Sequence, residues 1–239
     1  MTPSPFLGEF AGTALLLTMG GGVVANVVLN KTKGNNSGWI VITFGWAMAV
    51  FLGVYASNTM GGGGHLNPAV TIAMYLFNEE FDKALLPVYL GAQFAGAFVG
   101  AVLVWVCYKQ HFDETADKDL KLAVFSTGPA IRQPVYNFIT ELIGTFILVF
   151  GALNFAKPET SMGTLNALPV ALLVLGIGLS LGGPTGYAIN PARDLGPRIA
   201  HFVLPIKGKR DSDWGYSWIP VLAPIAGAVL AGLVFFKMM

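Results

Sequence analysis

The chain has 239 residues, of which 54% are hydrophobic and 11% are charged, and its formal net charge is +1. Soluble domains carry about 25% charged residues, so the composition excludes an ordinary soluble domain and favours a protein embedded in a lipid bilayer. A net charge so close to zero gives no electrostatic reason to expect nucleic acid as a partner.

Six segments are apolar enough to cross a bilayer, for which about 20 residues are needed. In chain order they cover residues 5–29, 38–56, 84–108, 133–156, 165–181 and 218–236. Short polar connectors separate most of them, and a longer connector of residues 109–133 joins the third to the fourth. We therefore expect an all-α membrane protein with six transmembrane helices.

Two further segments contain an Asn-Pro pair, "GGGGHLNPAV" and "TGYAINPARDLGP". A helix over residues 68–77 would rise roughly 15 Å, half of the roughly 30 Å apolar core of a bilayer. Proline is favoured at the first helical position and asparagine is a good N-cap. One such pair is usually a turn. Two of them predict two half-helices, one starting at Pro68 with Asn67 as its cap and the other at Pro191 with Asn190 as its cap.

The backbone before each half-helix needs its own explanation at membrane depth. Residues that precede proline prefer extended conformations, so we expect "GGGGHL" and "GYAI" to be extended. Their carbonyls are then bound by no helix, and such backbone survives only where it lines a water-filled path or is buried in protein. The carbonyls expected to line a path are those of Gly63, Gly64, His65 and Ala188.

An internal repeat relates the two halves of the chain. The segments "GEFAGTALLL" and "TELIGTFILVF" open the first and fourth spans, and "FAGAFVGAVL" in the third span is echoed by "IAGAVLAGLV" in the sixth. Each half reads helix, helix, Asn-Pro segment, helix, and three spans per half place the two halves in opposite orientations. We expect a single domain over residues 1–239, with a first repeat at 1–108, a connector at 109–133 and a second repeat at 134–239.

The repeat places Glu9 and Glu141 inside apolar helices, where a lone carboxylate is unfavourable and needs a partner. Our main interpretation is that they bind unpaired backbone groups of the Asn-Pro loops, and proton relay is the alternative. By inverted symmetry the half-helices meet at their N-termini, so their positive dipole ends converge. Each capping asparagine would keep its amide NH₂ free as a donor to a passing solute, in a path that repels cations.

With these features the chain resembles the major intrinsic protein family, the aquaporins and aquaglyceroporins, over almost its whole length. The resemblance rests on "HLNPAVT", "NPARDLGP", the helix-start glutamates, and two Asn-Pro-Ala motifs, Asn67, Pro68 and Ala69, and Asn190, Pro191 and Ala192. It implies a right-handed bundle of six helices and two re-entrant half-helices, with one pore per subunit in a homotetramer. It also implies a place in the cell membrane with cytoplasmic termini, and no cofactor or metal.

The family forms its narrowest point from four residues, and the resemblance implies Trp46, Gly178, Tyr187 and Arg193 for these positions. Water-selective members typically have histidine where this chain has Gly178, and we expect the glycine to open the constriction. The two aromatic residues would contact a carbon backbone, while Arg193 donates to hydroxyls and repels cations. Asp194 also matches the glycerol-conducting branch.

The sequence therefore predicts a passive channel for small uncharged polar solutes, chiefly glycerol. Water, dihydroxyacetone, urea, hydrogen peroxide and protonated lactic acid are further candidate solutes. The alternative is an ion-coupled secondary transporter of a small polyol or organic acid, since inverted repeats and broken helices also serve there. An enzyme is disfavoured, because no nucleophile–base arrangement or metal-ligand spacing is found.

The distribution of basic residues disagrees with the implied topology. Most lysines and arginines of the connectors fall on the side opposite the two termini, so the positive-inside rule would place the termini outside the cell. We follow the family and expect cytoplasmic termini.

Overall fold

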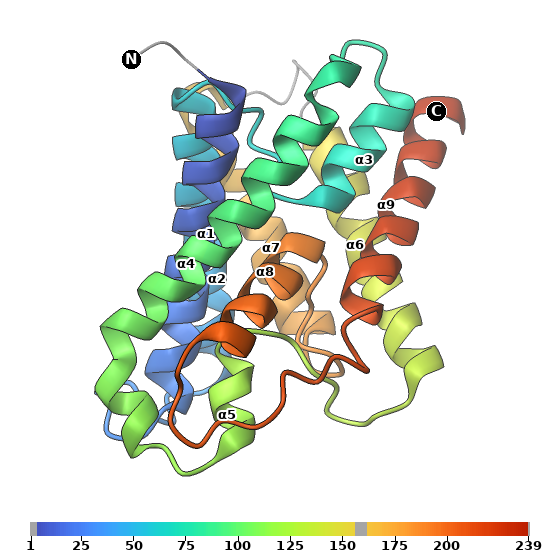
Figure 1. Ribbon diagram of the computed structural model, residues 1–239. Helices are drawn as coiled ribbons and strands as arrows, with labels where there is room; N and C mark the ends of the chain where they lie inside the picture. Colours follow the sequence, from blue (N-terminus) through green and yellow to red (C-terminus); the bar gives the residue numbers. More distant parts are fainter. Residues whose placement is uncertain (1–3, 156–161, 239) are drawn as a thin grey trace.

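The computed structural model describes residues 4–155 and 162–238, and every regular element in these two ranges is a helix (Figure 1). The long helices are α1 (Pro5–Val28), α2 (Trp39–Thr59), α4 (Leu86–Glu114), α6 (Pro134–Phe155) and α9 (Ile219–Met238). The shorter ones are α3 (Pro68–Phe77), α5 (Lys118–Ala123), α7 (Ala167–Leu181) and α8 (Pro191–Val203), with one-turn 3-10 helices at Lys83–Leu85 and Gly163–Leu165.

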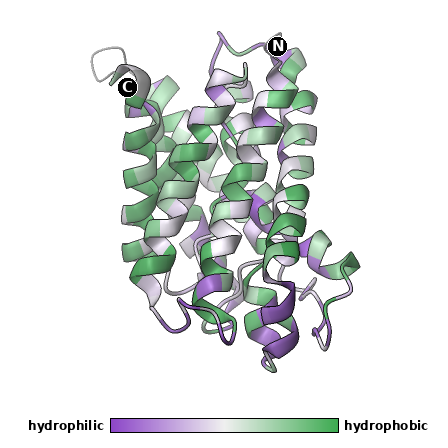
Figure 2. Ribbon diagram, turned by 90° about the vertical axis from the view of Figure 1, so that its left-hand side faces the viewer, coloured by the Kyte–Doolittle hydropathy of each residue, from purple (hydrophilic) through white to green (hydrophobic). Residues whose placement is uncertain are grey.

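The five long helices are each long and apolar enough to cross a membrane. The span expected at residues 165–181 begins instead with a 3-10 turn, and its helix α7 has 15 residues, fewer than the about 20 of a full span. Figure 2 shows apolar residues along the middle of the bundle and hydrophilic residues gathered at its lower end. The last residue of the expected span 133–156, Ala156, lies outside the described residues.

The connector expected at residues 109–133 is partly helical. Helix α4 continues past residue 108 to Glu114, and α5 forms a further short helix. The polar stretch "KQHFDE" contains neither proline nor glycine, so the helix continues beyond its apolar part until Thr115 caps it.

The contacts between helices repeat from one half of the chain to the other. Helix α1 packs against α2 and α4, and its counterpart α6 packs against α7 and α9. The half-helices are exchanged, since α3 packs mainly on α9 and α8 mainly on α4, while α2 and α7 meet between the halves. This pairing is the one that an inverted repeat of three helices and a half-helix requires.

Small residues allow the outer helices to pack closely. A methyl group added at Gly96 of α4 would lie 2.4 Å from the carbonyl oxygen of Phe10 on α1. At Gly227 of α9 it would lie 2.2 Å from the carbonyl oxygen of Leu142 on α6. The two "GA"-rich stretches that revealed the repeat are therefore the places where helix backbones approach one another, as in other bilayer proteins.

The two half-helices meet in the middle of the bundle and run apart from there. In Figure 1, α3 lies in the upper half and α8 lies below it, and the start of α1 and the end of α9 share the upper end. Because α3 and α8 contact each other and both begin at a proline after an asparagine cap, their positive dipole ends converge.

Candidate functional site

The two asparagines cap their half-helices. The side-chain oxygen of Asn67 accepts a hydrogen bond from the backbone N–H of Ala69 at 2.9 Å. That of Asn190 accepts from the backbone N–H groups of Ala192 at 3.0 Å and Arg193 at 3.2 Å. These bonds use the first free N–H groups of each helix, which is the role of an N-cap.

The amide groups of the two caps are not entirely free, contrary to the sequence-based expectation. Nδ2 of Asn67 donates to the carbonyl oxygen of Ile189, and Nδ2 of Asn190 donates to that of Leu66, both at 2.8 Å. An amide has two N–H groups, so one from each asparagine is used for this exchange and the other is left for the cavity that both residues line. The sequence could not show it, because the partners are more than a hundred residues apart.

The backbone before the two caps is not uniformly extended, and that prediction was wrong. Asn67 and Asn190, which directly precede proline, are extended with φ of −152° and −159°. Leu66, Tyr187 and Ile189 instead have φ of 51°, 38° and 43°, in the left-handed region. The proline restriction acts on one residue only, and the residues before it are free to alternate in handedness. Such alternation turns successive N–H groups to one side.

Each of these turned segments binds a glutamate. Glu141 accepts from the backbone N–H groups of Ala188 at 2.9 Å and Ile189 at 2.8 Å. Glu9 accepts from those of His65 at 3.0 Å and Leu66 at 2.8 Å. Because both carboxylates are buried, these bonds satisfy backbone donors that would otherwise be unpaired at this depth.

Glu9 has two additional partners that sequence reasoning missed. Ser57 Oγ donates to its Oε1 at 3.1 Å, and Gln93 Nε2 donates to its Oε2 at 2.7 Å. Gln93 also donates to Thr71 Oγ1 on α3 at 2.9 Å, so it joins α4, α1 and the first half-helix. The signal for Gln93 was present in the sequence, since an amide inside "GAQFAGAF" has to find a partner in a membrane.

A cavity of about 290 Å³ lies beside these loops. It is lined by both asparagines, by three of the four predicted constriction residues, Trp46, Tyr187 and Arg193, and by the loop residues Gly63, Gly64, His65 and Ala188. The rest of its wall is mostly aliphatic, with residues such as Val50, Val54, Leu148, Val149 and Val174. The cavity therefore combines a few polar groups with a mostly apolar wall.

Two residues of this wall, Arg193 and Trp46, are in contact with each other. The guanidinium carbon of Arg193 lies 4.3 Å from the centre of the Trp46 ring, a cation–π contact. The ring is held from behind by α1, where a methyl group at Gly20 would lie 2.2 Å from it. Gly20 therefore leaves room for the tryptophan beside α1, and the arginine stacks on the same ring.

Gly178 does not open the constriction by leaving empty space. A methyl group at this position would lie 2.9 Å from Cζ of Tyr187 and 2.9 Å from Cγ2 of Thr43. The phenol ring of Tyr187 thus occupies the place that a side chain at position 178 would take. Gly178 acts by letting this ring lie against α7, which corrects the expectation drawn from the sequence.

Comparison with known proteins shows the family to which this architecture belongs. The family model described as "Major intrinsic protein" matches residues 4–235. The chain belongs to the major intrinsic protein family. Proteins of this family are channels and not enzymes.

Three relatives of this major intrinsic protein cover nearly its whole length. A "Probable glycerol uptake facilitator protein" of Thermotoga maritima is 55% identical over 97% of this chain and 98% of its own. "Glycerol uptake facilitator protein 3" of Lactiplantibacillus plantarum is 53% identical over 96% of this chain and 94% of its own. The X-ray structure of the aquaglyceroporin from Plasmodium falciparum matches with a TM-score of 0.86 and 34% identity, over 98% and 95% of the two chains.

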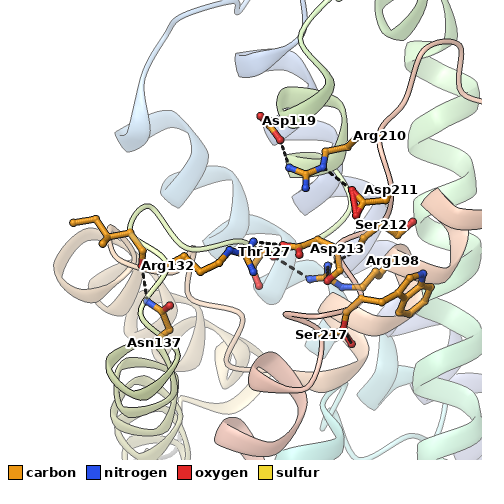
Figure 3. Close-up of polar contacts among 12 residues, drawn as sticks. Asp119, Thr127, Arg132, Asn137, Arg198, Arg210, Asp211, Ser212, Asp213 and Ser217 are labelled. Carbon is orange, nitrogen blue, oxygen red and sulfur yellow. Dashed lines mark hydrogen bonds and ion pairs between the residues drawn. The ribbon is translucent and has the colours of Figure 1, made fainter.

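Asp194 and Arg198 form a buried ion pair next to the second half-helix of this major intrinsic protein. Arg198 Nε donates to Asp194 Oδ1 at 2.8 Å, and Asp194 Oδ2 accepts from the N–H and the hydroxyl of Thr127, both at 2.7 Å. Arg198 also donates to the carbonyl oxygens of Ser212 at 2.7 Å and Thr127 at 3.0 Å (Figure 3). The pair joins α8 to two loops. The i, i+4 spacing of opposite charges was a signal that sequence reasoning overlooked.

Many basic residues opposite the termini have structural partners. Lys209 Nζ donates to carbonyl oxygens at the end of α8, those of His201 at 2.6 Å and Phe202 at 2.7 Å, and to that of the cap residue Leu204 at 2.7 Å. Four further cations are ion-paired, Lys31 with Glu114, Lys109 with Asp113, Arg132 with Asp213 and Arg210 with Asp119. Many of the basic residues on that side are therefore bound to groups of the protein itself.

Proposed function

We propose that this protein is a passive channel for small uncharged polar solutes, with glycerol as its principal solute. The observation that carries the proposal is the cavity in which Arg193 stacked on Trp46 faces an apolar wall, with Asn67 and Asn190 where the half-helices meet. Two relatives of similar length that are 55% and 53% identical are named as glycerol uptake facilitators, and they support this choice of solute.

The electrostatics of the cavity favour neutral solutes. Two helix N-termini with their partial positive charges converge on it, and Arg193 adds a full positive charge, so cations and protons are repelled. An anion gains attraction there but loses its hydration in an apolar passage, which is strongly unfavourable. A neutral molecule meets neither barrier.

The shape of the constriction favours a molecule with carbons on one side and hydroxyls on the other. The rings of Trp46 and Tyr187 offer apolar surface to a carbon chain, while Arg193 and the remaining N–H of each asparagine offer donors to hydroxyl groups. Glycerol matches both requirements. Water, dihydroxyacetone, urea, hydrogen peroxide and protonated lactic acid are smaller or similar in size and belong in the same test.

An ion-coupled transporter is the second candidate. The hydrogen bonds of the buried carboxylates argue against this function. Coupling needs an acid that is free to bind and release an ion. Glu9 and Glu141 are each bound to two backbone N–H groups, and Asp194 is bound to Arg198 and Thr127.

We also propose that the protein is a homotetramer in the cell membrane, with both termini in the cytoplasm. The family resemblance supports this assembly and orientation, and the partners found for the basic residues reduce the objection from the positive-inside rule. Chemical cross-linking of the purified protein tests the assembly. Protease accessibility of a C-terminal tag in intact cells tests the orientation, and cleavage from outside would contradict it.

The proposed function is tested with proteoliposomes and stopped-flow light scattering. We expect glycerol permeability well above that of empty vesicles, no accumulation against a gradient, and no flux of protons or cations. Lactic acid flux should rise as pH falls if the neutral acid is the permeant form. Saturable accumulation driven by an ion gradient would instead identify a coupled transporter.

A further inference from the structure

Trp39, the first residue of α2, contacts the constriction from behind. Its Nε1 donates to the carbonyl oxygen of Gly178 on α7 at 2.9 Å. Its ring meets the ring of Tyr187 edge to face, with centroids 5.8 Å apart and an interplanar angle of 77°. Among the described residues neither Trp39 nor Gly178 is part of the cavity lining, so of these two partners of Trp39 only Tyr187 borders the cavity.

Two glycines one turn apart complete this contact. A methyl group at Gly182 would lie 2.5 Å from Cδ1 of Tyr187 and 2.8 Å from Cζ2 of Trp39. A methyl group at Gly178 would meet the same phenol from its other end, 3.1 Å from the hydroxyl oxygen. The ring of Tyr187 therefore packs against Gly178 of α7, the cap residue Gly182 and the ring of Trp39, which restricts its movement.

The position of Tyr187 is unfavourable in two ways. Its backbone φ is 38°, a left-handed conformation that side-chain-bearing residues avoid and that is concentrated at functional sites. Its hydroxyl is buried and has no hydrogen-bond partner among the residues that the structure describes. The neighbouring hydroxyl of Thr43 is already donating to the carbonyl oxygen of Ile40 at 3.0 Å. A buried hydroxyl without a partner is unfavourable, and the cavity that Tyr187 lines can supply the missing partner.

We propose that Trp39 is a positioning residue for solute selection. It holds the hydroxyl of Tyr187 where it exchanges a hydrogen bond with a polyol in the constriction. This inference rests on the proposed channel function and names a determinant of its substrate class. The guanidinium of Arg193 binds adjacent hydroxyls of the solute with its fork of donors, and Tyr187 binds a further hydroxyl on the aromatic side. The pair therefore favours a triol over the same molecule with one hydroxyl missing.

The test compares glycerol with 1,2-propanediol, which keeps the adjacent hydroxyls and replaces the third with hydrogen. Tyr187→Phe removes only the hydroxyl, and we expect the glycerol to 1,2-propanediol permeability ratio to fall about two- to tenfold, the effect of one neutral hydrogen bond. Trp39→Phe keeps an aromatic ring and removes the N–H, and the ratio should fall in the same direction. Permeabilities are corrected for empty vesicles.

The double variant separates positioning from a general structural effect. If Trp39 acts through the Tyr187 hydroxyl, Trp39→Phe changes the ratio no further once Tyr187→Phe is present. Trp214→Phe is the matched control, because Trp214 is as exposed as Trp39, 41%, and meets Phe202 at the same 5.8 Å edge-to-face distance. Its ratio should equal that of the unmodified protein.

Several results would overturn the inference. They are an unchanged ratio in Trp39→Phe, full additivity in the double variant, or an equal change in Trp214→Phe. If Trp39→Phe does not assemble, Gly182→Ala tests the same contact, because it keeps both aromatic side chains and its methyl group displaces them, and an unchanged ratio there also counts against the inference. An unmodified protein that conducts no glycerol would overturn the proposed function itself, which is a separate outcome.

Discussion

Asn67 and Asn190 each donate a hydrogen bond into the loop that the other one caps, to the carbonyl oxygens of Ile189 and Leu66. Both bonds are 2.8 Å long, as expected for two positions related by the repeat. Each asparagine therefore starts one half-helix and ties it to the other half of the chain. All four residues of this crossing line the cavity.

Asn67→Asp tests this crossing. A carboxylate still accepts from Ala69 N–H but cannot donate to Ile189 O, so two acceptors face each other. We expect a loss of about 1–3 kcal/mol in the free energy of unfolding, lower glycerol flux and a cation leak, because the negative charge offsets the converging dipoles. Vesicles with an entrapped pH dye measure the leak of protons. Asn190→Asp should behave alike, and a strong difference between the two would contradict the symmetry.

Glu141→Gln tests the bracing of the second loop. The amide keeps one acceptor for the backbone, but its NH₂ then faces the N–H of Ala188 or Ile189. We expect a decrease of about 1–3 kcal/mol in the free energy of unfolding, because one buried donor loses its partner. Thermal unfolding in detergent at fixed lipid content is the measurement.

Thr140→Val is the control for Glu141→Gln, since Thr140 is on the same helix and bonds only the carbonyl oxygen of Tyr136 within the described contacts. It should leave the unfolding temperature nearly unchanged. An unfolding temperature of Glu141→Gln equal to that of Thr140→Val would show that the bracing bonds contribute little.

Arg198→Met tests the buried ion pair. It leaves Asp194 buried without its guanidinium partner, and we expect a loss of about 3–5 kcal/mol in the free energy of unfolding. Arg210→Met is the matched control, because Arg210 pairs with Asp119 and Asp211 near the surface, where a pair contributes at most about 1 kcal/mol. Chemical denaturation of both variants gives the two values. Equal losses would remove Arg198 as an anchor of the second half-helix.

Gly178→Ala tests the packing of Tyr187 against α7. The new methyl group would lie 2.9 Å from the phenol, so the ring has to move toward the passage. We expect glycerol permeability to fall more than water permeability, because the larger solute needs the full width. Gly176→Ala on the same helix is the control, since nothing described lies within 4 Å of its added methyl group. Equal loss of both permeabilities in Gly178→Ala would argue against a size effect.

The starts of the half-helices were predictable because their signals are local. An asparagine followed by proline specifies cap and first turn within two residues, and α3 covers residues 68–77 as expected. The repeat was recognisable because corresponding helices have identical residues at corresponding positions. Glu9 and Glu141 were recognisable as bracing residues because a carboxylate in an apolar helix needs a partner.

The remaining features depend on residues that are distant in the sequence. The alternating backbone before each cap follows from the binding of two N–H groups to one carboxylate, and no local preference predicts it. A glycine at position 178 favours a wide constriction, yet the ring of Tyr187 fills the space beside it. The composition, the starts of the half-helices and the repeat could each be recognised from the sequence alone. The crossing of the two asparagines and the support of Tyr187 by Trp39 exist only after helices 120 residues or more apart have packed together.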